Sequence, residues 1–406
     1  MTISQTPARI SPKAPWRRTA AVRVGCVAGV ILALGTGQAQ PAVKVHPPAF
    51  HFVTASAPAS RCEQPVLDLG PTHPLPLSKI RYFAYQIQGL RRRGAVDALV
   101  SSRYDMMVVD PTRTDWLDPG ADFDTRGMVA RLKSSKASDG IHRKLVIAYI
   151  DIGEAENWRW YWTWPDMWEN AGSRPEVLPT FILGHDPDGW GGNFPVAYWD
   201  PRWKDIVIYG RHLDLRQFTE RKPDFASVLD EVIKDGFDGV YLDWVEGFSH
   251  PPVVEEARRQ GLNPADEMTT FIQEIRDYAA ARVPRFMIIQ QNGSVLARRG
   301  PEIFLKVDAI AQEEVWYDGR ATDKWDDPSG YDHPVDPATT AGVIRNLKLY
   351  QRACVPVFNV EYALKLAPDA YAKSYARGYV PYVTRRSLGA LTTTPPPGYL
   401  KMDVPK

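Results

Sequence analysis

Eight short apolar segments, each followed by a longer stretch of helical character, dominate the sequence between residues 81 and 383. Such an alternation is typical of β–α units around a parallel sheet, and runs that are apolar at nearly every position suit strands covered on both faces. The predicted strands are Arg81–Ile87, Asp105–Val109, Lys144–Asp151, Gly239–Asp243, Arg285–Gln291, Val307–Glu313, Val355–Glu361 and Tyr379–Val383. Helices are predicted near 124–136, 203–215, 224–235, 264–282, 338–352 and 368–377.

This pattern predicts a (β/α)8 TIM barrel as a single domain over residues 77–392. A doubly wound open sheet is the alternative, but it usually needs a glycine-rich phosphate turn after its first strand, and Gln86-Ile-Gln-Gly-Leu90 is not one. Residues 40–76 are rich in Pro and Ala and are predicted to be a linker and N-terminal wrap, and 393–406 a C-terminal tail.

The first 39 residues have the order of a secretory signal, with basic residues, then the apolar run Val24–Leu34, then small residues near Ala39. The apolar run is short for a membrane span, and an uncleaved anchor is the alternative. We therefore expect export to the periplasm or the extracellular space, with no membrane contact after cleavage. Cys62 and Cys354 could then pair, because such compartments are oxidising.

Charge and cysteine content exclude several classes of protein. Lys and Arg number 49 against 48 Asp and Glu, and removal of residues 1–39 leaves a net charge of −4. Such a chain offers no excess positive charge to nucleic acid. Three cysteines with no CxxC pair argue against zinc ribbons and redox dithiols. We expect a monomer that needs no metal and no cofactor.

An acid stands where the fourth predicted strand ends. In a barrel, side chains alternate between the interior and the surrounding helices, and active sites gather at the carboxyl ends of the strands. Val240 and Leu242 suit the helix side, so Tyr241 and Asp243 are predicted to face inward. Burying a carboxylate in an apolar core costs free energy, whereas a carboxylate at the open end of the barrel can contact a substrate. We therefore prefer a catalytic role for Asp243 to a helix cap or an ion pair.

The strand Val307–Glu313 repeats the pattern. With Ile310 on the helix side, alternation directs Glu313 into the barrel and Glu314 away from it. One β-bulge would exchange the two glutamates, because it shifts the alternation by one residue. Asp243 and Glu313 are thus predicted as two acids at one rim.

Polar side chains at or near other strand ends would complete a pocket for a polar substrate at the same rim. The predicted binding residues are Asp110, Tyr149, Asp151, Glu154, Trp199, Asp200, Tyr241, Trp244, Gln291, Asn292, Glu361 and Tyr362.

Tryptophan is concentrated after the third predicted strand, where eight of the 13 tryptophans lie between positions 158 and 203. Flat rings on the expected active face can stack on sugars or on a cationic ligand, and alternatively they pack the insertion itself. The even spacing of Trp158, Trp160, Trp162 and Trp164 would place them on one face of a strand and scatter them around a helix.

Four segments carry a resemblance to a known family, namely Ala148–Glu156, Tyr198–Trp203, Gly236–Trp244 and Gln291–Gly293. They resemble glycoside hydrolase family 114, and more closely its bacterial and archaeal branch. Members of that branch are described as endo-α-1,4-polygalactosaminidase-like. They were once described as extracellular proteins related to cysteinyl-tRNA synthetase. The likeness covers roughly residues 78–390, whereas the zinc site and nucleotide motifs of a synthetase are missing from the sequence.

The resemblance implies a (β/α)8 barrel that hydrolyses polymers of α-1,4-linked galactosamine or N-acetylgalactosamine. It also implies a catalytic aspartate after the fourth strand and a catalytic glutamate after the sixth, which here are Asp243 and Glu313. The best-characterised fungal members resemble Asp-Pro-Asp-Asn-Val-Asp where this chain has Tyr241-Leu-Asp-Trp-Val-Glu246. Because this difference lies beside the expected sugar subsite, it bears on the identity of the polymer.

The residues and the resemblance together predict hydrolysis of an O-glycosidic bond in a polysaccharide by two carboxyl groups. Ionised Asp243 would attack or stabilise the anomeric carbon, and Glu313, with a pKa raised by apolar surroundings, would protonate the leaving oxygen. The other acids would hold hydroxyls or an ammonium group of the sugar. A non-catalytic carbohydrate-binding barrel and a hydrolase of another α-linked glycan are the alternatives.

Overall fold

The computed structural model of the protein describes Cys62 and residues 70–111, 123–164, 168, 173–187, 189–210, 226–319 and 332–399. The predicted signal at 1–39, most of the predicted linker, the end of the tail and the end of the helix predicted at 203–215 lie outside the described residues. Those assignments stay predictions. Among the described residues, no helix combines the length and the apolar character that crossing a membrane requires.

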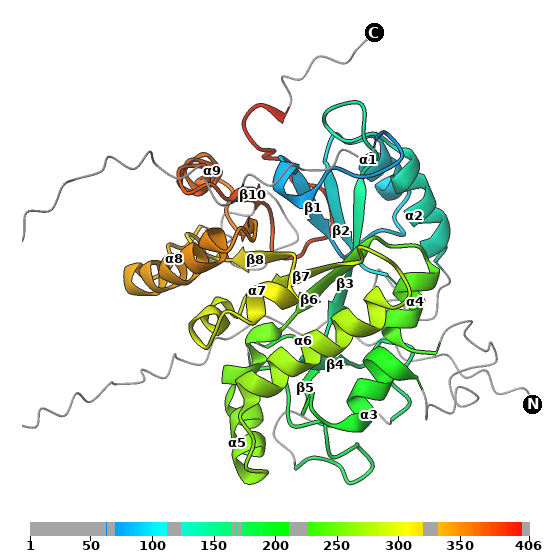
Figure 1. Ribbon diagram of the computed structural model, residues 1–406, viewed down its shortest axis with the longest axis vertical. Helices are drawn as coiled ribbons and strands as arrows, with labels where there is room; N and C mark the ends of the chain where they lie inside the picture. Colours follow the sequence, from blue (N-terminus) through cyan, green and yellow to red (C-terminus); the bar gives the residue numbers. More distant parts are fainter. Residues whose placement is uncertain are drawn as a thin grey trace, which may run out of the picture. The chain divides into compact units, whose positions relative to one another are not determined.

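Eight parallel strands form one sheet in which spatial order follows chain order, β1-β2-β3-β6-β7-β8-β9-β10 (Figure 1). The strands are β1 (Phe83–Gln86), β2 (Met106–Val109), β3 (Leu145–Asp151), β6 (Gly239–Asp243), β7 (Met287–Gln291), β8 (Ala309–Glu313), β9 (Val357–Glu361) and β10 (Val380–Val383). Each of them falls within a predicted strand. A doubly wound sheet is excluded, because its strand order reverses at a switch point.

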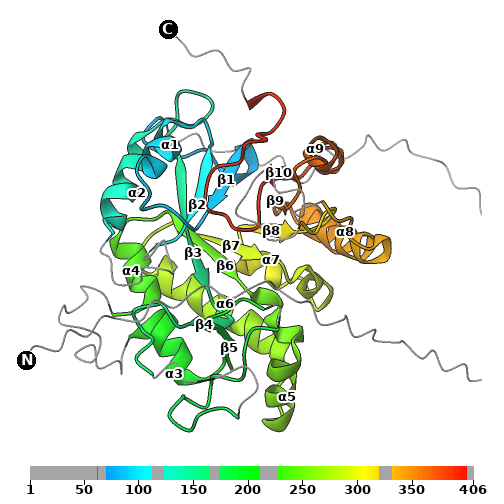
Figure 2. The ribbon, with the colours of Figure 1, turned by 180° about the vertical axis from the view of Figure 1, so that it is seen from behind.

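The first and last strands meet and nearly close the sheet. The ring of Phe83 in β1 packs against Tyr382 in β10 with centroids 5.6 Å apart, and the N–H of Ile87 donates to the carbonyl of Leu388 at 3.1 Å. Figure 2 shows β1, β9 and β10 side by side from behind. The fold is therefore a (β/α)8 barrel, as predicted.

Helices surround this barrel (Figures 1 and 2). The α-helices are α1 (Ala95–Ser101), α2 (Thr125–Ser134), α3 (Pro201–Lys204), α4 (Val228–Lys234), α5 (Pro251–Arg259), α6 (Pro264–Ala280), α7 (Ile303–Lys306), α8 (Pro337–Arg352) and α9 (Ala367–Tyr375). Shorter turns are the 3-10 segments η1 (Leu77–Lys79), η4 (Val245–Ser249) and η5 (Ser294–Arg298), and the π-helical segment η2 (Asp205–Tyr209).

Three helices were not predicted, and one predicted helix differs. Helix α5 begins with two prolines, which indicate a loop in isolation but fit the first turn of a helix, where no N–H partner is needed. Helices α1 and α7 are short, with seven and four residues. The helix expected from residue 203 begins at Pro201 instead, and it widens into η2 before Gly210, whose φ of 63° ends the turn.

A two-stranded antiparallel hairpin, β4 (Glu154–Glu156) and β5 (Asn193–Pro195), lies outside the main sheet. It comes from the tryptophan-rich insertion that follows β3. In Figure 1 it lies next to α3, at the opposite end of the barrel domain from α9 and β10. We refer to residues 154–195 as the hairpin insertion.

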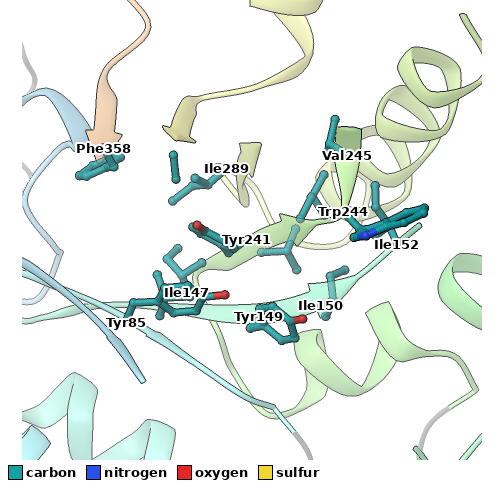
Figure 3. Packing of buried hydrophobic residues seen from close by; sticks show 14 of the residues in the cluster. Tyr85, Ile147, Tyr149, Ile150, Ile152, Tyr241, Trp244, Val245, Ile289 and Phe358 are labelled. Carbon is teal, nitrogen blue, oxygen red and sulfur yellow. The ribbon is translucent and has the colours of Figure 1, made fainter. Parts of the chain in front are cut away.

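Tyrosine rings fill the barrel interior near the carboxyl ends of the strands. The ring of Tyr85 packs on Tyr241 with centroids 5.0 Å apart and on Tyr149 at 6.2 Å (Figure 3). The contact of Tyr241 with Tyr85 of the opposite part of the sheet agrees with its predicted inward direction along β6. These tyrosine rings lie directly below the acids at the strand ends, and two of their hydroxyls contact those acids.

Acids at the amino ends of the strands have structural contacts. Asp105 accepts hydrogen bonds from three backbone N–H groups. Asp238 accepts two from the Arg143 guanidinium, each at 2.7 Å, and Asp308 accepts one from Arg276 at 2.7 Å. These carboxylates are occupied by protein donors, so they stabilise the barrel at the end away from the candidate site.

A disulfide joins Cys62 to Cys354, with Cα atoms 5.2 Å apart. Cys354 follows α8 in the left-handed conformation, with φ of 63°. The bond ties the N-terminal side of the domain to the α8–β9 connection across 292 residues of sequence.

Candidate active site

Three neighbouring strands end in polar side chains at one rim. Strand β6 ends at Asp243, β7 at Gln291 and β8 at Glu313. The residue after each strand adopts the left-handed conformation with φ between 52° and 58°, and these residues are Trp244, Asn292 and Glu314. Residues other than glycine and asparagine rarely adopt this left-handed backbone conformation. The backbone therefore turns sharply after each strand, and the last side chain of the strand stays at the mouth of the barrel.

Asp243 is held by donors on both of its carboxylate oxygens. The Tyr149 hydroxyl, from the neighbouring strand β3, donates to Oδ2 at 2.5 Å. The backbone N–H of Trp244 donates to Oδ1 at 2.9 Å. Both bonds fix the orientation of the carboxyl group, and both favour its ionised form.

Glu313 faces the same interior, as the alternation along β8 predicts. The Tyr362 hydroxyl donates to its Oε2 at 2.8 Å, and the Tyr241 hydroxyl is 3.2 Å from its Oε1. Strand β8 pairs regularly with β9 up to Glu313, so the bulge that would have exchanged it with Glu314 does not occur there. Glu314 contacts the Arg386 guanidinium and, contrary to the prediction that it points away, lines the same cavity as Glu313.

The environment raises the pKa of both acids. Burial, followed by the negative charge of Glu313, raises the pKa of Asp243 to about 7, although Tyr149 and the Trp244 N–H act in the other direction. Burial also raises the pKa of Glu313, opposed by the Tyr362 hydrogen bond and the positive charge of Arg386. Each acid can thus keep a proton closer to neutral pH than an exposed carboxyl group, which general acid catalysis requires.

A third acid, Glu246, lies beside this pair in η4. Its Oε1 accepts a hydrogen bond from Asn292 Nδ2 at 2.7 Å, and Asn292 Oδ1 accepts the N–H of Glu313 at 2.9 Å. Its Oε2 is buried and has no hydrogen-bond partner in the part of the chain that the structure describes. Burial and the charge of Asp243 raise the pKa of Glu246 to about 8. Asn292 therefore links the third acid to the backbone that carries Glu313.

The three acids line one cavity of about 230 Å³ at the carboxyl ends of the strands. Tyrosine and tryptophan rings share its wall with the polar groups, a combination that suits an organic ligand with both apolar faces and hydrogen-bonding groups. Arg386 is the only Lys or Arg among the lining residues in the described ranges. The cavity is thus rich in carboxyl groups and poor in cations.

Seven of the predicted binding residues line this cavity, namely Asp110, Tyr149, Glu154, Trp244, Gln291, Asn292 and Tyr362. Tyr241 reaches the site through its contact with Glu313. Asp110 is bound by Arg159, whose guanidinium donates to both carboxylate oxygens at 2.8 Å. Its charge is thereby balanced by a buried cation.

Besides Tyr241, four further predicted binding residues are not among the lining residues of this cavity. Asp151 accepts the backbone N–H of Gly153 and of Glu154, and Asp200 caps α3. Trp199 is buried and donates to Gln260 at 3.0 Å. Glu361 accepts the consecutive N–H groups of residues 315–317. The contacts of Asp200, Trp199 and Glu361 are structural. Asp151 differs, because its Oδ2 is buried with no hydrogen-bond partner among the described residues, and burial and the charge of Asp243 raise its pKa.

Most of the clustered tryptophans pack the insertion. Trp162 stacks on Phe194 with centroids 4.8 Å apart, and Trp203 is fully buried with its Nε1 donating to the Ile152 carbonyl at 2.9 Å. Residues 157–164 form turns, so their even spacing does not define a strand face. Of these eight tryptophans, two line the cavity in the described part of the chain, namely Trp158 and Trp190. Trp244, which lies outside the cluster, lines it as well.

Some lining residues escaped the sequence analysis. Glu246 follows Asp243 by three residues, and the one-turn helix η4 returns its side chain to the rim. Arg386 follows the last strand by three residues, and its guanidinium lies 4.7 Å from the centre of the Tyr362 ring. The strand-end rule, applied to β10 as it was to β6 and β8, would have directed attention to this segment.

A (β/α)8 barrel in which two acids face one cavity at the carboxyl ends of its strands has the architecture of a glycoside hydrolase. The model of glycoside-hydrolase family GH114 matches residues 78–397. The chain belongs to this family, which confirms the resemblance seen in its sequence motifs.

Curated relatives share this extent. An uncharacterised protein of Deinococcus radiodurans is 30% identical over 322 residues, covering 79% of this chain and 85% of its own length. The uncharacterised protein MJ1477 of Methanocaldococcus jannaschii is 29% identical over 328 residues, covering 77% of this chain and 78% of its own.

Solved structures with similarity include the glycoside hydrolase domain of PelA from Pseudomonas aeruginosa. It has a TM-score of 0.46 and 16% identity, covering 77% of this chain and 97% of that domain. Another is Aspergillus fumigatus Ega3 in complex with galactosamine, with a TM-score of 0.48 and 15% identity, covering 77% of this chain and 93% of that one.

Proposed function

We propose that this GH114 glycoside hydrolase cleaves polymers of α-1,4-linked galactosamine or N-acetylgalactosamine, with Asp243 and Glu313 as its catalytic acids. The observation that carries the proposal is the pair of half-buried acids that face one cavity. Each acid is contacted by a tyrosine hydroxyl, from Tyr149 or from Tyr362, and has a raised pKa.

The mechanism follows from what each carboxyl group can do. Asp243, as a carboxylate, attacks or electrostatically stabilises the anomeric carbon while the glycosidic C–O bond breaks. Glu313 gives its proton to the leaving oxygen and then takes one from the water that completes hydrolysis. Carboxyl groups about 5–5.5 Å apart act with retention of configuration, and those about 6.5–9.5 Å apart with inversion. Proton NMR of the first product formed distinguishes the two outcomes.

The charge of the cavity supports an amino sugar. Asp243, Glu246 and Glu313 line it with further acids, whereas Arg386 is the lining cation in the described part of the chain. An excess of carboxylates lowers the free energy of a bound ammonium group relative to an acetamido group. We therefore expect polymers with free amino groups to be better substrates than fully N-acetylated ones.

The test is release of reducing ends from an α-1,4-galactosamine polymer, its N-acetylated form and chitosan. Asp243→Asn and Glu313→Gln should each lower kcat by at least about 10³-fold, with unchanged circular dichroism. Asp200→Asn is the matched control, since Asp200 caps α3 away from the cavity and Asn is an equally good cap. Normal turnover by either active-site variant would overturn the assignment, and a non-catalytic binding barrel would tolerate the loss of Glu313.

We also propose export to the periplasm or the extracellular space. The Cys62–Cys354 disulfide supports this location, because structural disulfides persist in oxidising compartments and are rare in a reducing cytosol. Cell fractionation with thiol alkylation tests it. Full-length protein found only in the cytosol with both thiols alkylated would contradict export.

A further inference from the structure

Two tryptophans reach the active-site cavity from outside the barrel. Trp158 and Trp190 line it from the hairpin insertion, and the side chain of Asn193 lies with them. The Trp190 side chain is well exposed for an indole, with 42% of the residue accessible to solvent. The cavity wall therefore has an aromatic section that no barrel strand supplies.

Hydrogen bonds hold the backbone of this section in place. Asp186 Oδ1 accepts the N–H of Trp190 at 3.0 Å, and the Trp190 carbonyl accepts the N–H of Asn193 at 3.2 Å. The carbonyl of Gly192 accepts the N–H of Asn157 at 2.9 Å. Both tryptophans are thus attached to a preformed turn, so that a ligand meets them at low cost in conformational entropy.

Gly192 lets the Trp158 ring lie directly on the turn. It has a φ of 94°, and a Cβ there would stand 2.9 Å from the Trp158 ring and 2.6 Å from Asn157 Oδ1. A larger residue would displace the ring, so the glycine and the tryptophan form one arrangement.

Polar groups stand next to the two rings. Asn193 Nδ2 donates to Glu154 Oε2 at 3.0 Å, and both residues line the cavity. Indole faces that cover C–H groups, with a carboxamide and a carboxyl group for hydroxyl or ammonium groups, form the combination that binds a sugar ring.

The section lies to one side of the catalytic pair. The hairpin insertion follows β3, which neighbours β6 with Asp243, whereas Glu313 lies on β8 beside β9. Figure 1 likewise shows β4 and β5 far from β8. The hairpin insertion is therefore on the Asp243 side of the cavity and extends away from Glu313.

We infer that Trp158, Trp190, Asn193 and Glu154 form a sugar subsite that binds a unit of the polymer other than the two joined by the cleaved bond. This inference rests on the proposed function for the identity of the polymer. A subsite of this kind makes affinity depend on chain length, since only a longer oligomer reaches it.

The test uses calorimetric titration of galactosamine hexamer into the catalytically inactive Asp243→Asn protein. Adding Trp190→Ala should weaken hexamer binding about tenfold, whereas Trp190→Phe should keep it within about threefold because a ring remains. In the active enzyme, Trp190→Ala should raise KM for the hexamer about tenfold and leave kcat within about twofold. Tyr375→Ala, at an exposed aromatic of α9 away from the cavity, is the matched control and should change neither.

Equal hexamer affinity with and without Trp190, or a fall in kcat at constant KM, would overturn the subsite. Gly192→Ala gives a second measurement, because it displaces Trp158 and should also weaken hexamer binding. An Asp243→Asn protein that does not bind galactosamine hexamer would overturn the proposed substrate together with the subsite. Hexamer binding by the Asp243→Asn protein that retains Trp190 therefore distinguishes a wrong substrate from a wrong subsite. No binding by this protein rules out the substrate, whereas binding that does not depend on Trp190 rules out the subsite alone.

Discussion

The hydrogen bond from Tyr149 favours the ionised form of Asp243, one of the two proposed catalytic acids, and Tyr149→Phe removes this bond with little change in shape. The hydroxyl donates to Oδ2 at 2.5 Å inside a buried site. Because this bond favours the carboxylate, its loss raises the pKa of Asp243. The variant should therefore need a higher pH to ionise Asp243.

The size of this effect follows from the energy of such a bond. A hydrogen bond to a charged group contributes about 1.5–3 kcal/mol, and one pKa unit corresponds to about 1.4 kcal/mol. The pKa of Asp243, raised by burial and Glu313 to about 7, should therefore rise by roughly one to two further units in the variant. At pH 7 the ionised fraction then falls about 5- to 50-fold, and kcat/KM falls with it.

The assay is the pH profile of kcat/KM on galactosamine hexamer between pH 4 and 10. Its acid limb should move upward by roughly one to two units in Tyr149→Phe. Tyr85→Phe is the matched control, since its ring packs on Tyr149 and Tyr241 but its hydroxyl makes no hydrogen bond to Asp243 in the described structure. An unmoved limb in Tyr149→Phe, or the same shift in both variants, would refute the reasoning.

Three further predictions concern stability. Cys354→Ser opens a loop of 292 residues in the unfolded chain and should lower the free energy of unfolding by about 2–6 kcal/mol in urea titrations; an unchanged midpoint would contradict it. Burial and Asp243 raise the pKa of Glu246 to about 8, so the unfolded chain releases this proton at lower pH than the folded one, and stability is lost as pH rises from about 4.5 to 8. Glu246→Gln should therefore have a Tm higher than the wild type by roughly 2–6 °C at pH 8 and by less at pH 5, and a constant difference would refute this. Glu361→Gln replaces the carboxylate that accepts three consecutive N–H groups and should cost about 1–3 kcal/mol in the same titration, and an unchanged midpoint would show that these bonds do not hold the loop after Glu313.

Sequence alone was sufficient for the barrel strands, because a strand buried on both faces must be apolar at nearly every position. Strand β6 was predicted with its observed bounds, and β8 was predicted with its last residue correct. Helix boundaries depend on packing and capping as well as on pattern. Helix α5 starts at a pair of prolines, and α7 has a single turn, so neither has a periodic pattern that distinguishes it from a loop.

Within the candidate site, alternation along a strand was the reliable signal. It directed Asp243 and Glu313 inward, and both accept hydrogen bonds there. It could not tell which strand-end acids are already occupied, as Glu361 is by backbone N–H groups. Glu246 and Arg386 were beyond its reach, because a helical turn and the closure of the barrel bring them to the rim.

The left-handed residues after β6, β7 and β8 have a consequence for thermal adaptation of this enzyme. Each non-glycine residue in that conformation costs about 1–3 kcal/mol, which the surrounding contacts must offset. A Trp244→Gly or Glu314→Gly substitution would remove this conformational cost. It would also make the backbone next to Asp243 or Glu313 more flexible, so that the carboxyl group is less well oriented. Selection for growth at high temperature and selection for fast turnover therefore act in opposite directions on the same short stretch of backbone.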